Sequence, residues 1–369
     1  MRVLIINSVC GIRSTGRIAT DIAKEYMSQG HTCRIAYGRE YVPEEYQNIS
    51  YKIGSRWKVM TNGIMARVFD NEGFNAKLET LKFIKWANTY NPDLLWIHNI
   101  HGYYININML FDWIKSRPQM KVNWTLHDCW SFTGHCSHFS HIQCYKWEEQ
   151  CKNCAQKKEY PGSLVCDHSL KNFRRKKDVF LGVKDMTIIT PSQWLADLVK
   201  RSFLNEYPIE VHYNTIDKNV FSPVESNFRE RMGLHHKKIV LGVASTWGER
   251  KGLGMFEQLS RLLPDQYQVV LVGPDKKQSA CLPDNIICIG RTDSVQELAE
   301  IYSSADVFVN PSTEETFGLT TLEALSCGTQ AIVYANTACE EVARMYGGIV
   351  VERDCISLLT AIRNVCEGK

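Results

Sequence analysis

The stretch Asn310-Pro-Ser-Thr-Glu-Glu-Thr-Phe-Gly-Leu-Thr-Thr-Leu-Glu-Ala-Leu-Ser-Cys-Gly328 decides the fold of this 369-residue chain. A short apolar run ends in Asn-Pro-Ser, a polar loop follows, and a periodic apolar segment begins near Gly318. This order predicts a buried strand, a loop and a helix. Because a helix start presents free backbone amides and the positive end of the helix dipole, it is a natural site for phosphate.

Two carboxylates flank the predicted helix start. Glu315 lies in the loop just before it, and Glu323 lies about one turn inside the helix. They can accept hydrogen bonds from the hydroxyls of a sugar and a ribose while the helix start holds a diphosphate between them. The alternative is that both are acidic residues that only favour the start of a helix.

Short apolar runs alternate with longer amphipathic segments on both sides of this stretch. Such alternation predicts parallel sheets covered by helices on both faces. We predict strands at 2–7, 33–37, 94–98, 121–126, 187–190, 239–245, 268–273, 285–290, 306–310, 330–334 and 348–351, and helices at 16–28, 109–115, from 193 onward, and at 253–263, 295–303, 319–326, 339–345 and 356–365.

The alternation falls into two groups joined by a Pro-containing connector at 214–223. We therefore predict an α/β protein with two doubly wound domains, 1–215 and 216–369, each of ordinary size. Two such sheets that face each other leave a cleft at the carboxyl ends of their strands, where open α/β sheets bind ligands.

Composition excludes several functional classes. A net charge of +3 is too mild for a nucleic-acid binder, which carries a concentrated basic face. No apolar run reaches the ~18 residues of a membrane span. The apolar start at 3–6 fits a buried first strand better than a signal peptide, since Asn7-Ser8 interrupts it and no small-residue cleavage site follows. We expect a cytoplasmic protein.

A second polar turn, Trp247-Gly-Glu-Arg-Lys-Gly252, directly follows a predicted strand. Its two cations can neutralise a diphosphate leaving group, where developing negative charge most needs stabilising. The alternative is an ordinary solvated basic turn.

Polar residues also follow predicted strands in the first half. Gly16 ends the loop at 7–16 and lets backbone approach a ligand closely, although a tight strand-to-helix turn explains it as well. His127 and Asp128 come at the carboxyl end of one predicted strand, and His98 and His101 follow the strand before it. Each histidine has the alternative of being a hydrogen-bonded structural residue.

At 310–328 the sequence resembles the retaining glycosyltransferases of family 4, which have the GT-B fold of two Rossmann-like domains facing across a cleft. Their signature is two glutamates separated by seven residues in a Pro-Ser…Glu-x-Phe-Gly-Leu…Glu-Ala…Gly context. The resemblance implies that Glu315 contacts the donor sugar and Glu323 the nucleotide ribose. The matching positions are Glu315, Phe317, Gly318, Leu319, Glu323, Ala324 and Gly328.

The resemblance extends to the other motifs. Lys251-Gly252 is similar to the family's pyrophosphate-binding Lys-Gly, although Thr246 stands where the family usually has an Arg, and Arg250 is the substitute. The loop at 289–293 is similar to the one whose backbone meets the nucleotide base. The resemblance thus implies a donor site made of Gly16, Arg250, Lys251, Arg291, Thr292, Glu315, Phe317, Gly318, Leu319, Thr320 and Glu323.

The resemblance also makes His127 the active-site histidine that contacts the donor sugar. The expected catalytic residues are then His127, Glu315 and Lys251, and the candidates on the acceptor side are His101 and Asp128. Retaining chemistry without a covalent enzyme intermediate requires no general base. Cations and helix amides stabilise the diphosphate, so no cofactor or metal is expected for catalysis.

The stretch 92–167 is similar to a subgroup that builds capsules, exopolysaccharides and related surface glycans, the colanic-acid type. We expect a retaining transfer from a nucleotide-diphosphate sugar to a glycan or lipid-linked glycan acceptor. The alternatives are a hydrolysing nucleotide-sugar epimerase and a non-catalytic module that binds a nucleotide sugar. Family members usually continue beyond a point such as Lys369 with a helix that crosses back to the first domain, and we expect that helix to be missing.

Residues 134–167 interrupt the alternation and indicate an inserted loop rich in Cys, His and aromatic residues. Its thiols can close a tetrahedral structural zinc site, in which one of the neighbouring histidines can replace a thiol. Free thiols and a disulfide are the alternatives, although disulfides are rare in the cytosol. The residues concerned are Cys136, Cys144, Cys151 and Cys154, with His135, His138 and His141.

The segment Lys171-Asn-Phe-Arg-Arg-Lys-Lys177 is basic with an aromatic residue inside. A solvated helix face is the simpler interpretation. The other is a peripheral contact with anionic lipid headgroups at the inner face of the membrane, where each cation adds ~1 kcal/mol. That contact would suit a lipid-linked acceptor.

Overall fold

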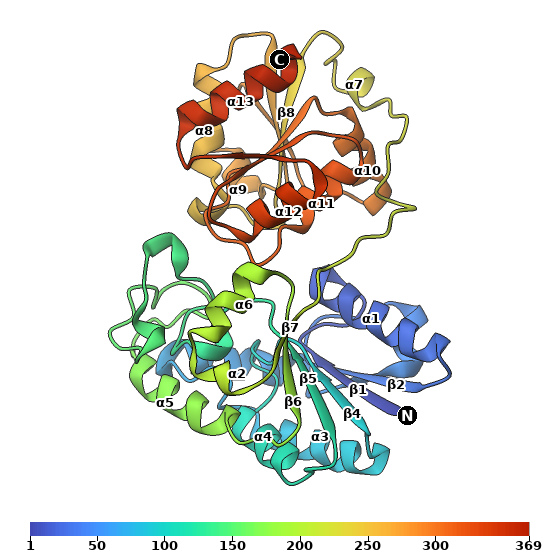
Figure 1. Cartoon of the computed structure of the whole chain (residues 1–369), viewed down its shortest axis with the longest axis vertical. Coiled ribbons are helices and arrows are strands. Elements are labelled where there is room, and N and C mark those ends of the chain that lie inside the picture. Colours follow the sequence, from blue (N-terminus) through green and yellow to red (C-terminus); the bar gives the residue numbers. More distant parts are fainter. Residues whose placement is uncertain (369) are drawn as a thin grey trace. The chain divides into compact units, whose positions relative to one another are not determined.

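The computed structural model describes residues 1–368, and the chain divides into two compact units. The first unit ends at His212 and the second begins at Tyr213. We predicted the boundary after residue 215. Each unit is a parallel sheet with helices packed on both faces (Figure 1), so the predicted fold class of two doubly wound sheets is confirmed.

The first unit contains a seven-stranded sheet in the order β3-β2-β1-β4-β5-β6-β7, and every neighbouring pair is parallel. Its elements are β1 Arg2–Asn7, α1 Arg13–Ser28, β2 Thr32–Tyr37, β3 Ser50–Lys52, α2 Arg56–Phe69, α3 Lys77–Tyr90, β4 Leu94–Ile97, α4 Ile107–Lys115, β5 Lys121–Thr125, α5 Ser169–Phe180, β6 Met186–Thr190, α6 Gln193–Lys200 and β7 Ile209–Val211, with short 3-10 turns at Glu44–Ile49, Trp130–Phe132, Ser140–Ile142, Lys146–Glu148 and Phe203–Glu206.

The second unit contains a six-stranded sheet in the order β10-β9-β8-β11-β12-β13, again parallel throughout. Its elements are α7 Phe228–Arg231, β8 Lys238–Val243, a 3-10 turn η6 Glu249–Lys251, α8 Leu253–Leu262, β9 Tyr267–Val272, α9 Lys276–Ser279, β10 Ile286–Ile289, α10 Val295–Ser304, β11 Val307–Asn310, α11 Leu319–Ser326, β12 Ala331–Tyr334, α12 Ala338–Tyr346, β13 Ile349–Val351 and α13 Cys355–Glu367.

The central strands are nearly continuous apolar runs because helices cover both of their faces. All residues of Val3–Ile6 in β1 are fully buried, as are Ala331–Val333 in β12. In each sheet the chain reverses its direction of winding beside the first strand, since β1 lies between β2 and β4 and β8 lies between β9 and β11. Loops diverge at such a point, so the carboxyl ends of these strands are where each unit can bind a ligand.

Every predicted strand lies on an observed one. Within residues 1–368 the structure adds the strands β3 and β7 and the helices α2, α3, α7 and α9, and α5 covers the stretch 171–177, for which a helix face was one of two interpretations. β3 and β7 are three-residue strands at the edges of the first sheet, too short to leave a period in the sequence. α2 and α3 were missed because several of their large apolar residues point to solvent, which hides the buried face.

The prediction of a basic surface at Lys171–Lys177 is wrong for part of that stretch. It belongs to α5, which buries Phe173 and Lys176. The Lys176 ammonium donates hydrogen bonds to the carbonyl oxygens of Trp130 at 2.7 Å and Thr133 at 3.2 Å, and it lies 3.5 Å from the centre of the Trp130 ring. This lysine therefore stabilises the interior of the first unit.

Within the described residues, no helix is long and apolar enough to cross a bilayer.

We expect Lys176→Ala to lower the free energy of unfolding by about 2–4 kcal/mol, because two buried carbonyl oxygens lose their donor. Lys177→Ala, on the exposed side of the same helix, is the matched control and should change it by less than about 0.5 kcal/mol. Urea denaturation followed by circular dichroism measures both. Equal destabilisation of the two variants would contradict the role given to Lys176.

Candidate functional site

In the second unit, two loops at the carboxyl edge of the sheet are joined by side-chain and backbone contacts. The ammonium of Lys251, from the turn after β8, forms an ion pair with the carboxylate of Glu315, from the loop before α11, 64 residues further along. Arg250 donates from Nη1 to the carbonyl oxygen of Glu314 at 2.8 Å, and its own carbonyl accepts from the amide of Thr313 at 2.9 Å. The structure thus brings the two polar motifs of this half together.

Two glycines permit this close packing. Gly252 has φ +74°, and a Cβ there would lie 2.6 Å from the Pro311 ring. Gly318, which precedes α11, has φ +94°, and a Cβ there would lie 2.5 Å from the sulfur of Cys339. Both positions combine a left-handed backbone with no space for a side chain, so only glycine fits.

Glu323 lies on α11 and is held from the neighbouring helix. Its Oε2 accepts a hydrogen bond at 3.0 Å from the hydroxyl of Tyr302, a fully buried residue of α10. Phe317 stabilises the start of α11, because it packs with Leu322 and Val342 in a small apolar cluster. Leu319 and Thr320 occupy the first turn of α11 and are half-buried.

The remaining predicted residues of this unit lie in the loop between β10 and α10. Arg291 is exposed and Thr292 is half-buried there. Because all strands of this sheet are parallel, the loop lies at the same edge as the start of α11. Thr246, which stands in place of the Arg that the resemblance implies, is exposed in the loop after β8.

In the first unit, two histidines from neighbouring strands stack on each other. His98 follows β4 and His127 follows β5, and their atoms Nδ1 and Nε2 lie 2.9 Å apart. Burial lowers the pKa of His127 to about 4, and burial also places the pKa of His98 well below its usual value. Both rings are therefore neutral near pH 7. His98 is the direct partner of His127.

His101 and Asp128 form a second polar pair beside them. His101 Nε2 lies 2.8 Å from Asp128 Oδ2, and its Nδ1 lies 3.0 Å from the hydroxyl of Tyr160. Asp128 Oδ1 accepts from the amide of Trp130 at 2.9 Å. Burial acts to raise the pKa of Asp128, but the charge of His101 and its hydrogen bond outweigh this and lower that pKa to about 2. The carboxylate therefore stays ionised.

Tyr160 is a residue of this cluster that sequence reasoning missed. It belongs to the insert at 134–167, whose other residues drew attention only through their thiols and imidazoles. Its contact with His101 spans 59 residues, so no local pattern in the sequence identifies it. The hydroxyl of Tyr103 also reaches the insert, 3.4 Å from the Pro161 carbonyl.

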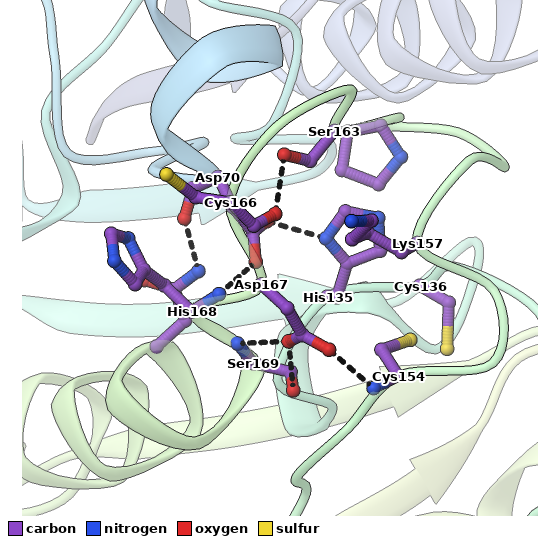
Figure 2. A network of polar contacts seen from close by, with 12 residues as sticks. Asp70, His135, Cys136, Cys154, Lys157, Ser163, Cys166, Asp167, His168 and Ser169 are labelled. Atoms are coloured by element: carbon purple, nitrogen blue, oxygen red, sulfur yellow. Dashed lines mark hydrogen bonds and ion pairs between the residues drawn. The ribbon is translucent and has the colours of Figure 1, made fainter.

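The insert is fixed to the first unit by a network of polar contacts around Asp70, the residue that ends α2 (Figure 2). Asp70 accepts from His135 Nδ1 at 2.5 Å and from the amide of His168 at 2.6 Å. Asp167 accepts from the amide of Cys154 at 2.7 Å and from the Ser169 hydroxyl at 2.6 Å. These bonds hold both ends of the insert.

The zinc interpretation of the cysteines stays a prediction. The Cys136 thiol donates a hydrogen bond to the sulfur of Cys154, which lowers the pKa of Cys154 to about 7. Cys144, Cys151 and Cys154 pack against the same apolar core as Cys136. Within residues 1–368, however, no group of three or more Cys, His, Asp or Glu is arranged to hold a metal ion. All four thiols are free.

Gly16 lies in the first turn of α1 and is buried under the loop that precedes the helix. A Cβ there would lie 3.1 Å from Val9 and 3.2 Å from the amide of Gly11. This packing by itself accounts for a glycine at this position.

The neutral histidine pair predicts a pH dependence of folding. The folded pKa of His127 lies below the unfolded value of about 6.5, so the unfolded chain binds the proton first. The contribution of His127 to the free energy of unfolding is therefore fully present above about pH 6.5. As the pH drops toward 4, the free energy of unfolding falls by up to about 3 kcal/mol. In urea denaturation, His127→Asn should reduce this slope. His212→Asn, which alters an exposed histidine, should leave it unchanged, and identical slopes for His127→Asn and the unmodified chain would refute the assignment.

Comparison with known proteins relates this geometry to a family. Residues 237–367 match the family model described as glycosyl transferases group 1. Over 367 residues the chain is 24% identical to WcaC of Escherichia coli K12, which carries the name of a colanic acid biosynthesis glycosyl transferase; the match covers 96% of this chain and 88% of WcaC.

Two solved structures have the same fold. HepE of Anabaena, crystallised with UDP and glucose, superposes with a TM-score of 0.67 at 16% identity, covering 100% of this chain and 90% of that one. WaaG, a glycosyltransferase involved in lipopolysaccharide biosynthesis, gives a TM-score of 0.63 at 14% identity, covering 99% and 90%. The second unit is thus similar to the glycosyltransferases of group 1, and the whole chain has the GT-B fold of these solved structures.

Proposed function

We propose that this enzyme transfers a sugar, with retention of its anomeric configuration, from a nucleoside-diphosphate sugar to a glycan or lipid-linked glycan acceptor in the synthesis of a surface polysaccharide. The observation that carries the proposal is the contact between Lys251 and Glu315 at the start of α11, one turn from Glu323. The cation and the helix start can bind a diphosphate, and the two carboxylates can each bind a sugar on one side of it.

The ion pair suggests how donor binding prepares the site. Lys251 forms an ion pair with Glu315. A diphosphate carries more negative charge than one carboxylate and competes for the lysine. Glu315 is then free to accept hydrogen bonds from the hydroxyls of the transferred sugar, while Glu323, aligned by Tyr302, accepts from the ribose.

The other residues of the second unit complete this proposed donor site. Amides of Gly318–Thr320 face the diphosphate and stabilise the charge that develops on it as the bond to the sugar breaks. Arg250 braces the loop through its bond to the Glu314 carbonyl. Arg291 and Thr292 are proposed to meet the nucleotide base. Since fixed cations and amides balance the charge, we propose no catalytic metal.

In the first unit, the neutral His127 suits a hydrogen bond to the donor sugar without transfer of a proton. His101 and the ionised Asp128 offer one donor and one acceptor group to the hydroxyls of the acceptor. Gly16 is retained as a proposed donor contact, although its packing needs no ligand. The name of WcaC supports a surface glycan as the product.

The reaction is tested with purified enzyme, a panel of nucleoside-diphosphate sugars and a lipid-linked glycan acceptor. UDP-hexoses come first, because the HepE structure contains UDP and glucose. We expect a product with the donor's anomeric configuration by NMR, formed equally with and without EDTA. An epimerised sugar from donor alone would favour the epimerase, and an inverted product would exclude retention. Loss of activity in EDTA with recovery in magnesium would exclude the metal-free mechanism.

The donor site itself is tested by binding rather than turnover. Lys251→Met and Glu323→Gln should each raise the Kd for the nucleoside diphosphate by about 10- to 100-fold, the loss of one charged hydrogen bond. Glu230→Gln, on the exposed face of α7, is the matched control and should leave Kd unchanged. Isothermal titration calorimetry measures all three. Unaltered affinity in both site variants would refute the assignment of these residues to a donor site. It would also exclude a non-catalytic module that binds a nucleotide sugar through them.

A further inference from the structure

Helix α2 presents its large apolar side chains to solvent. Five of them have exposed fractions that are unusual for a helix of a compact domain: Trp57 74%, Met60 49%, Ile64 56%, Met65 44% and Phe69 44%. Their spacing of three, four, one and four residues places them along one side of the helix. A lone exposed apolar residue needs no explanation, but a continuous stripe indicates a surface that is covered in use.

The opposite side of α2 is made of small residues and is already committed. Gly63 and Ala66 are buried, and a Cβ at Gly63 would lie 3.3 Å from the ring of Tyr103. Asn62 donates from Nδ2 to the carbonyl oxygen of Tyr103 at 3.0 Å. The helix is therefore anchored by its small residues, and its exposed stripe cannot turn inward without breaking that packing.

The insert extends this surface at the end of α2. The amide of Leu164 donates to the carbonyl oxygen of Arg67 at 2.7 Å, and the amide of Cys166 donates to that of Val68 at 3.2 Å. These bonds fix Leu164 and Val165 beside the last turn of the helix, where their exposed fractions are 71% and 65%. We call the exposed apolar residues of α2 together with Leu164 and Val165 the α2 face.

The charges around the α2 face select one kind of partner. Residues 56–69 contain Arg56, Lys58 and Arg67 and no acidic residue, and all three cations lie on the exposed side. The acidic residues that follow, Asp70 and Glu72, are buried and hydrogen-bonded to the protein. Apolar side chains that include a Trp, flanked by cations, are typical of helices that lie in the interface of an anionic bilayer.

We propose that the α2 face docks the enzyme on the surface of an anionic lipid membrane. The surface predicted at Lys171–Lys177 cannot do this as a whole, since α5 buries Phe173 and Lys176. Docking by α2 also has a consequence for the acceptor. Glu72, two residues beyond the end of α2 at Asp70, accepts from the amides of Gly102 and Tyr103, directly after His101. On the proposed function, a lipid-linked acceptor is thus presented beside His101 and Asp128.

The docking is tested with the full-length chain and sucrose-loaded vesicles of equal parts phosphatidylglycerol and phosphatidylcholine. Ile64→Glu should lower the fraction of enzyme that sediments with the vesicles, with a fall in partition coefficient of about tenfold or more from lost apolar burial and an added negative charge. Ile356→Glu is the matched control: Ile356 is 80% exposed but stands alone on α13, and this variant should bind as the unmodified chain does.

A second pair of measurements separates the contributions. Arg56→Glu with Lys58→Glu should weaken binding to these vesicles, and pure phosphatidylcholine should bind the unmodified chain less tightly. No sedimentation of the unmodified chain, or equal binding by Ile64→Glu, would overturn the proposal. So would sedimentation equilibrium in which Ile64→Glu dissociates a dimer without altering vesicle binding, since the occupant would then be a second copy.

Failure of membrane docking can be distinguished from failure of the proposed transferase function. The α2 face contains no residue of the proposed donor site, so Ile64→Glu should keep its Kd for the nucleoside diphosphate. Vesicle binding that persists in a chain without transferase activity would leave the docking intact. A donor-active chain that ignores vesicles would refute the docking alone.

Discussion

The ion pair between Lys251 and Glu315 is the contact on which the second unit's site depends. It ties two loops that the sequence separates by 64 residues, and both loops have conformations that serve it. Gly252 allows the turn to press on Pro311, and Gly318 allows the chain to enter α11 against Cys339. The positive end of the helix dipole disfavours a cation at a helix start, and the neighbouring carboxylate of Glu315 compensates the charge of Lys251.

In the first unit the candidate polar residues form a buried cluster rather than an ion pair between two loops. These residues are buried at the ends of β4 and β5. Burial and the neighbouring groups together determine whether each of them is charged. His98 and His127 remain neutral, whereas Asp128 remains ionised because His101 and the Trp130 amide bind it. Uncharged hydroxyls suit such a surface. On the proposed function, the charged donor would bind the second unit and a sugar hydroxyl of the acceptor would meet the first.

The repeating strands and the paired glutamates could be predicted from sequence because each depends on neighbours in the chain. What could not be predicted depends on distant contacts. Lys176 stands in a basic run and reads as a surface residue, yet the ring and carbonyl of Trp130 bind it 46 residues away. Tyr160 gives no local sign that it reaches His101, 59 residues earlier.

α2 shows most clearly how a local pattern can mislead. A helix is usually recognised because its large apolar residues face the core, but here Gly63 and Ala66 face the core and the large residues face out. Small residues bring the helix close to Tyr103, and the same closeness carries Glu72 to the loop of His101. The packing that makes α2 hard to predict therefore also places the helix beside the loop of the polar groups proposed to receive the acceptor. A sugar carrier anchored in lipid would need that proximity, because its reactive hydroxyl stays near the membrane surface.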